Sequence, residues 1–247
     1  YEIIKKHSIY GYEMVKQNKR KCATLHIRPY NYDKTIDKIM EDNLVWRPIQ
    51  RTKTYSGFSH KHFPVKKLDN DCSVYGVLAQ NNKDAEAFIK ASNSNNNVDH
   101  IDIGDLLGFP DCCRNHFNKV WPEFFDPVFQ SAQNTKHEQI DKKTIEIKDM
   151  HIASHQMLRY SGFRLTSHFP CSLNCQETIE TGKDWYELAL NKYPEKLNAL
   201  EKILTLPGSW SVLHGVTIVK TKPFTIISNS LPTKKEWKVK WNEVQTY

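Results

Sequence analysis

The spacing of apolar residues separates segments with helical periodicity from segments with strand periodicity. Ile36, Ile39 and Leu44 lie three to five positions apart, which predicts a helix over residues 32–44. Similar patterns predict helices over residues 84–91, 145–160, 176–193 and 195–206. Short alternating or continuous apolar runs predict strands over residues 24–28, 72–79, 212–219 and 224–227. The mixture predicts an α+β fold, with helices and a small mixed or antiparallel sheet around the cysteine site described below.

Changes in this patterning predict how the chain is divided. Apart from the predicted strand over residues 24–28 and helix over residues 32–44, residues 1–70 look irregular. They are expected to form an N-terminal extension or subdomain. Residues 71–247 are expected to form the main α+β domain. The polar, turn-forming run over residues 92–97 is the clearest candidate linker.

Two short segments carry four of the six cysteines. Residues 108–113 read Gly-Phe-Pro-Asp-Cys-Cys, and residues 168–175 read His-Phe-Pro-Cys-Ser-Leu-Asn-Cys. Proline is favoured at the first position of a helix, so Pro110 and Pro170 are each expected to begin one. The free N–H groups and positive dipole end of a helix N-terminus favour thiolates and bound anions.

We therefore predict that Cys112, Cys113, Cys171 and Cys175 share one metal site. Cys171 and Cys175 are four residues apart and would lie on one helical face. Cys112 and Cys113 would point about 100° apart on a helix, which favours a cluster over one small tetrahedral ion. An iron–sulfur cluster of the 4Fe-4S type is the favoured cofactor, and zinc is the alternative. Four buried thiols that only pack as small hydrophobes remain a further interpretation.

Three residues near these cysteines are candidate accessory groups. His168 could be an extra ligand or a proton donor, and His116 lies one helical turn beyond the Cys-Cys pair. Arg114 could pair with a cluster sulfur or an anionic substrate. Capping or core hydrogen bonding is an equal interpretation for His168, and a solvated side chain is the favoured interpretation for Arg114.

Other histidines and cysteines have simpler interpretations. His151 and His155, four apart on a predicted helix, could face one ligand, although a polar face is the favoured interpretation. Cys22 and Cys72 are expected to be ordinary core or surface thiols.

Composition and charge narrow the possible environments and partners. The 247 residues are 39% hydrophobic and 26% charged, as in ordinary globular proteins, and no apolar run approaches the roughly 20 residues of a membrane span. Free thiolates suit a reducing, cytoplasmic environment. The net charge of +7 favours an anionic partner such as nucleic acid, and basic–aromatic segments over residues 51–67 and 234–241 could stack bases. An exposed loop and a half-buried strand are the structural alternatives for these two segments.

The two cysteine segments also resemble an uncharacterised family, a domain of unknown function found in archaea, bacteria and viruses. Its signature is Leu-Gly-Phe/Tyr-Pro-x-Cys-Cys followed by His-x-Pro-Cys-Ser-x-x-Cys, which residues 107–113 and 168–175 match. The resemblance covers about residues 70–230. It implies that the four cysteines act as a unit, and it assigns no reaction.

These observations leave two function classes. The first is an iron–sulfur protein which, as an enzyme, would modify a nucleotide or a nucleic-acid base. The second is a non-enzymatic, zinc-stapled or metal-free module that binds nucleic acid or serves as a subunit of a protein complex.

Overall fold

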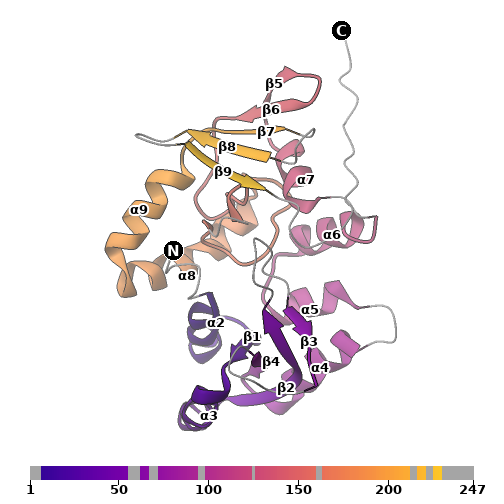
Figure 1. The fold of residues 1–247 in the computed structure, drawn as a ribbon, viewed down its shortest axis with the longest axis vertical. Coiled ribbons are helices and arrows are strands. Elements are labelled where there is room, and N and C mark those ends of the chain that lie inside the picture. The colour runs from indigo at the N-terminus through magenta and orange to yellow at the C-terminus, as the bar shows by residue number, and fades with distance from the viewer. Residues whose placement is uncertain are drawn as a thin grey trace. The chain divides into compact units, whose positions relative to one another are not determined.

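The computed structural model describes residues 7–54, 62–66, 72–93, 98–123, 126–159, 163–211, 216–220 and 225–229. Contacts divide the chain into two compact units, an N-terminal unit of residues 5–109 and a C-terminal unit from Pro110 onward. Each unit contains helices and one antiparallel sheet within the described ranges (Figure 1). The predicted α+β class is therefore confirmed.

The N-terminal unit is built around a four-stranded sheet in the order β1-β4-β2-β3. Its elements are α2 (His7–Lys16), β1 (Cys22–Ile27), the 3-10 helix η1 (Pro29–Asn31), α3 (Tyr32–Glu41), β2 (Val45–Thr54), β3 (His62–Pro64), β4 (Cys72–Ala79), α4 (Asn82–Asn93) and α5 (His100–Leu106). β4 pairs antiparallel with both β1 and β2. The two strands and two helices predicted in this part of the chain are confirmed.

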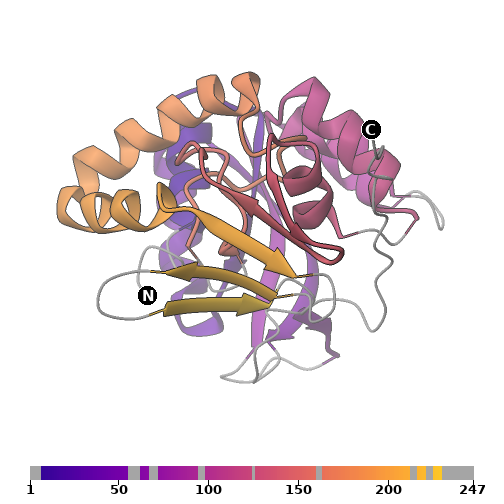
Figure 2. The ribbon, with the colours of Figure 1, turned by 90° about the horizontal axis from the view of Figure 1, so that it is seen from above.

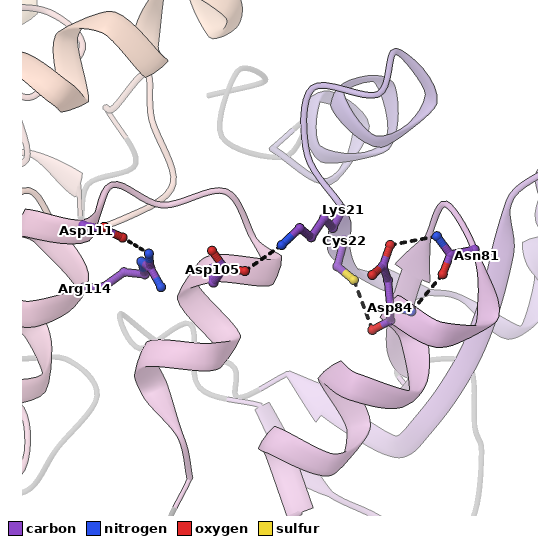
Figure 3. Close-up of polar contacts among 7 residues, drawn as sticks. All are labelled: Lys21, Cys22, Asn81, Asp84, Asp105, Asp111 and Arg114. Atoms are coloured by element: carbon purple, nitrogen blue, oxygen red, sulfur yellow. Dashed lines mark hydrogen bonds and ion pairs between the residues drawn. The ribbon is translucent and has the colours of Figure 1, made fainter.

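Alternating strand residues give this sheet two buried faces. Leu25 packs with Val15 of α2 and Ile39 of α3 in one cluster. Cys22 packs with Phe88 of α4 in the cluster on the other face, which also includes Val77 and Leu106. Cys22 is fully buried, and its thiol donates to the Asp84 carbonyl at 3.5 Å (Figure 3). Cys22 and Cys72 are both buried core thiols of this unit.

Side-chain contacts fix the ends of the helices in this unit. The Asp84 backbone N–H donates to Asn81 Oδ1 at 2.9 Å at the start of α4, and Asn81 Nδ2 donates to Asp84 Oδ2 (Figure 3). Near the end of α5, Lys21 Nζ lies 2.7 Å from Asp105 Oδ2.

The division of the chain differs from the predicted one. Sequence patterning places a boundary at residue 70, but β4 lies between β1 and β2 and so ties residues 72–79 to the N-terminal unit. The predicted linker at residues 92–97 is not the boundary either, because α4 extends to Asn93 and the Asp99 N–H donates to the Ala91 carbonyl at 3.2 Å. The division falls inside the first cysteine segment, between Phe109 and Pro110.

The C-terminal unit contains a five-stranded antiparallel sheet in sequential order, β5-β6-β7-β8-β9. Its elements are α6 (Asp111–Val120), α7 (Pro127–Gln133), β5 (Glu138–Asp141), β6 (Thr144–Ile147), α8 (Gln176–Lys192), α9 (Pro194–Leu204), β7 (Gly208–Ser211), β8 (Val216–Lys220) and β9 (Thr225–Asn229). Figure 2 shows α8 and α9 along one side of the strands. Pro194 begins α9, as its fixed φ angle favours.

The core of this unit joins the sheet to α7. Phe129 of α7 lies against Trp210 of β7, with ring centroids 5.2 Å apart. Ile145 and Ile147 of β6 are fully buried in the same cluster, as is Leu173 of the second cysteine segment. The core therefore reaches the polypeptide that carries two of the candidate metal ligands.

The predicted helix over residues 145–160 is absent from the described part of this region. Residues 144–147 form β6, and residues 148–159 follow as turns and irregular chain. Buried hydrogen bonds join this region to the chain that follows it: Thr166 Oγ1 donates to the Ala153 carbonyl at 2.7 Å, and Ser154 Oγ donates to the Leu173 carbonyl. The apolar residues of this segment are spaced as in a helix, but their side chains are buried in several directions and not on one helical face.

Among the described residues, no helix is both long enough and apolar enough to cross a membrane.

Candidate metal centre

The first cysteine pair lies in the first turn of α6. Pro110 is the N-cap residue rather than the first helical residue, because its ψ of 142° is not helical. Asp111 therefore begins the helix, and Cys112 and Cys113 follow in its first turn. Cys112 is half-buried, whereas Cys113 is only 1% exposed.

The second cysteine segment precedes a helix instead of forming its first turn. Cys175 is the N-cap of α8, and Cys171 lies in the non-helical turn before it. The expectation that Pro170 begins a helix with Cys171 on the same face as Cys175 is therefore wrong. Hydrogen bonds from outside the segment hold the turn, because Asn134 Nδ2 donates to the Cys171 carbonyl at 2.9 Å and the Leu173 N–H donates to Thr135 Oγ1 at 2.7 Å.

The four predicted sulfurs converge despite these local differences. Cys112 Sγ lies 3.5 Å from Cys175 Sγ, and Cys113 Sγ lies 3.6 Å from Cys175 Sγ. The sulfurs of Cys112 and Cys113 are 3.7 Å apart. Including Cys171, all four sulfurs lie within 4.8 Å of one another and could hold a metal ion.

The short distance between the sulfurs of Cys112 and Cys113 removes the argument that adjacent cysteines on a helix point too far apart to bind one small ion. On a helix, adjacent side chains leave the axis in different directions, yet these two sulfurs bend to within contact distance of each other. Adjacent cysteines can therefore serve one small ion here.

The thiols share hydrogen bonds in a way that singles out Cys175. Its pKa is lowered, chiefly because the thiols of Cys113 and Cys171 donate hydrogen bonds to it. The pKa of Cys113 is raised by its hydrogen bonds to Cys171 and Cys175 and by burial. Burial and a hydrogen bond to Cys175 raise the pKa of Cys112 to about 12. The hydrogen bonds donated to Cys175, at the start of α8, thus favour its thiolate form.

An aromatic stack joins the two cysteine segments independently of any metal. The ring centroids of Phe117 in α6 and Phe169 in the second segment are 5.6 Å apart. The guanidinium carbon of Arg159 lies 3.7 Å from the Phe169 centroid. Arg159 Nη2 also donates to the Ser167 carbonyl at 3.0 Å, and its Nη1 donates to the His168 carbonyl at 3.1 Å. These contacts fix the chain just before Pro170 and Cys171.

The three candidate accessory residues have different surroundings. His168 is 4% exposed, and its Nε2 lies 2.9 Å from Thr178 Oγ1. Arg114 pairs with Asp111 within α6 (Figure 3). His116 is half-buried, its Nε2 has no hydrogen-bond partner among the described residues, and burial lowers its pKa. Among the residues that the structure describes, the group that could hold a metal ion consists of the four cysteines.

Thr178 is the residue that sequence reasoning misses. It is fully buried, and its hydroxyl lies 3.2 Å from Cys113 Sγ. The usable signal is its position three residues after Cys175, because side chains at the N-cap and the third helical residue meet at a helix start.

His151 and His155 do not share a helical face, because residues 150–159 are irregular. His151 is exposed, and its Nδ1 accepts from the Ala153 N–H at 3.2 Å. His155 is 0% exposed, and neither of its ring nitrogens has a hydrogen-bond partner among the described residues. A ligand shared by the two histidines is therefore not supported.

The burial of His155 predicts a loss of stability in acid. Burial lowers its pKa to about 4, from about 6.5 in the unfolded chain. As the pH falls below 6.5, His155 becomes protonated in the unfolded chain but stays neutral in the folded chain. About 3 kcal/mol of stability is therefore lost by the time the pH passes the pKa of His155 in the folded chain. We expect His155→Leu to remove this loss and to be at least as stable as the original chain at about pH 8, because no unpaired nitrogens remain buried.

Urea unfolding of both chains at about pH 8 and about pH 5 measures this effect. The four cysteines are the same in both, so the difference between the two pH dependences isolates His155. Equal pH dependence in the two chains would contradict the prediction.

Comparisons of the chain with protein-family models, with curated proteins and with solved structures returned no match. The resemblance to the uncharacterised family stays a prediction.

Proposed function

We propose that Cys112, Cys113, Cys171 and Cys175 bind a single tetrahedral metal ion, with zinc as the natural occupant, and that this ion staples the C-terminal unit. The observation that carries the proposal is the spacing of the sulfurs. Sulfurs at 3.5–3.7 Å match the edge of a tetrahedron around one ion, which is about 3.8 Å for a Zn–S bond of about 2.3 Å.

The same spacing weighs against the iron–sulfur cluster that the sequence favours. In a 4Fe-4S cluster each cysteine binds a different iron atom at a corner, so the cysteine sulfurs stand farther apart, on the order of 6 Å. All four sulfurs here lie within 4.8 Å of one another. A cluster would require the α6 terminus and the second segment to separate, against the stacking of Phe117 on Phe169.

A set of four thiolates favours a structural over a catalytic role for the metal. Catalytic zinc sites keep one coordination position for water or substrate, whereas sites with four cysteines are closed. The ligands come from α6, the turn at Cys171 and the start of α8, so a bound ion would cross-link three parts of this unit. We therefore favour a zinc-stapled binding or structural module over a metal-dependent enzyme.

The partner of this module is a separate question. The net charge of +7 supports an anionic partner such as nucleic acid. The tail at residues 234–241 and most of the basic–aromatic segment at residues 51–67 lie outside the residues whose side chains the structure describes. Nucleic-acid binding therefore stays a prediction from the sequence.

Metal analysis of the full chain, purified without oxygen, tests the proposal. We expect a colourless protein with one zinc ion per chain. Cobalt(II) in place of zinc should give the visible absorption of tetrahedral thiolate coordination. Iron together with acid-labile sulfide would establish the cluster instead, and a chain that binds no metal after incubation with zinc would refute both.

A further inference from the structure

A buried chain of hydrogen bonds leads from His168 through Thr178 to Cys113. His168 Nε2 lies 2.9 Å from Thr178 Oγ1, and Thr178 Oγ1 lies 3.2 Å from Cys113 Sγ. The three residues are 4%, 0% and 1% exposed. Solvent therefore does not compete for these contacts, and each is stronger than it would be at the surface.

The negative charge of a metal-bound thiolate determines which group donates in each of these hydrogen bonds. A metal-bound cysteine sulfur is deprotonated and can only accept, so in the contact between Thr178 and Cys113 the hydroxyl is the donor. The hydroxyl oxygen is then free to accept from His168, which places a proton on Nε2 of the imidazole. The order of donation is His168 Nε2–H to Thr178, and Thr178 O–H to Cys113.

We propose that Thr178 is a positioning residue of the metal centre, whose hydroxyl, oriented by His168, donates to the Cys113 thiolate and sets how strongly this sulfur binds the ion. This inference rests on the proposed four-thiolate site and identifies the residues that tune it. Partners of this kind around a metal site commonly change its metal affinity by 10–100-fold when they are removed.

The need for such a donor follows from charge. Four thiolates around a divalent cation leave two net negative charges, and at Cys113 this charge is taken out of water. Cys113 receives a second hydrogen bond from the Cys171 backbone N–H at 3.4 Å. Cys112 is half-buried, and the sulfurs of Cys113 and Cys175 lie 3.7 Å and 3.5 Å from its own. Two donors of the protein thus face the Cys113 sulfur, the Thr178 hydroxyl and the Cys171 N–H.

The position of Thr178 in α8 makes the hydroxyl rigid. It is the third residue after the N-cap Cys175, within the first helical turn. Its branched β-carbon restricts χ1 to few rotamers in a helix. A serine would keep the donor with more freedom, and a valine would keep the shape without the donor.

Cobalt(II) titration of the full chain, in competition with a chelating dye, tests the role of Thr178. We expect Thr178→Val to bind cobalt about 10–100-fold more weakly and to shift the sulfur-to-cobalt charge-transfer band to lower energy, because Cys113 becomes more electron-rich. Thr178→Ser should keep both properties close to those of the original chain. A merely structural role of Thr178 would lower thermal stability without moving the band.

A second pair of variants tests the role of His168, which begins the series of hydrogen bonds. His168→Leu should weaken cobalt binding in the same direction, whereas His168→Gln, which retains an N–H donor, should restore it. If circular dichroism shows that Thr178→Val does not fold, the cobalt affinities of the two His168 variants test the inference instead. Unchanged affinity and spectrum in Thr178→Val, or equal affinity in the two His168 variants, would overturn the inference alone. Failure of the original chain to bind cobalt or zinc would overturn the four-thiolate site and this inference with it.

Discussion

Replacing Cys175 with serine should abolish tight metal binding and unfold the C-terminal unit at temperatures where the original chain is stable. Cys175 lies within 3.6 Å of both sulfurs of the first pair and occupies the N-cap of α8. For structural zinc the binding free energy, about 10–16 kcal/mol at neutral pH, becomes folding free energy. Loss of one ligand should therefore cost several kcal/mol. Metal content and calorimetric unfolding, each with and without a chelator, measure the effect.

Cys72→Ala is the matched control for this experiment. Cys72 is also a buried cysteine, 1% exposed, but it lies in β4 of the N-terminal unit and outside the group of four. Its replacement should leave the metal content at one ion per chain. Unchanged metal affinity in Cys175→Ser would reject the ligand assignment. The assignment would also be rejected if Cys72→Ala lost the metal while Cys175→Ser kept it.

The second large effect is expected from adding one methyl group to α8. Gly182 is buried, and a Cβ built on it would lie 2.3 Å from the Cβ of Ala153. Both atoms are attached directly to backbone, so neither can rotate away, and α8 would have to move from the irregular segment. Overpacking of this severity should cost about 3 kcal/mol, which exceeds the roughly 1 kcal/mol that alanine gains over glycine in a helix. Because Cys175 and Thr178 begin the same helix, metal affinity should fall as well.

Replacement of Ala153 with glycine provides the matched rescue. In Gly182→Ala/Ala153→Gly the methyl group has moved from one side of the contact to the other, and the next nearest atom to the new Cβ, Ala153 Cα, is at 3.5 Å. Urea unfolding of the original chain, both single variants and the double variant gives the interaction free energy between the sites. We expect the double variant to recover most of the lost stability. Simple addition of the two single effects would show that the contact is not the cause.

The gathering of the cysteines was within reach of sequence reasoning, whereas the local geometry that gathers them was not. Two segments that each contain Phe-Pro ahead of their cysteines identify the four sulfurs, but they do not show that Pro110 is an N-cap or that Cys171 lies in a turn. Those details depend on contacts from far along the chain, such as Asn134 with the Cys171 carbonyl. Local propensity cannot supply such partners.

The region after β6 shows the same limit. Met150, Ala153 and Met157 are buried and lie three and four residues apart, as on one face of a helix, but the chain there is irregular. Its backbone groups find partners on other segments, as when Thr166 donates to the Ala153 carbonyl. Apolar spacing predicts a helix only where one face is buried, and here the side chains are buried on several sides.

The wide separation of the two cysteine pairs along the chain has a consequence for biosynthesis. A growing polypeptide that has left the ribosome only as far as Pro170 carries two of the four sulfurs of the centre, so it would offer the proposed ion only a partial and weaker set of bonds. The complete site first exists once Cys175 has emerged. Metal supply at that moment, rather than earlier in translation, would then govern how much of the newly made protein reaches its mature form.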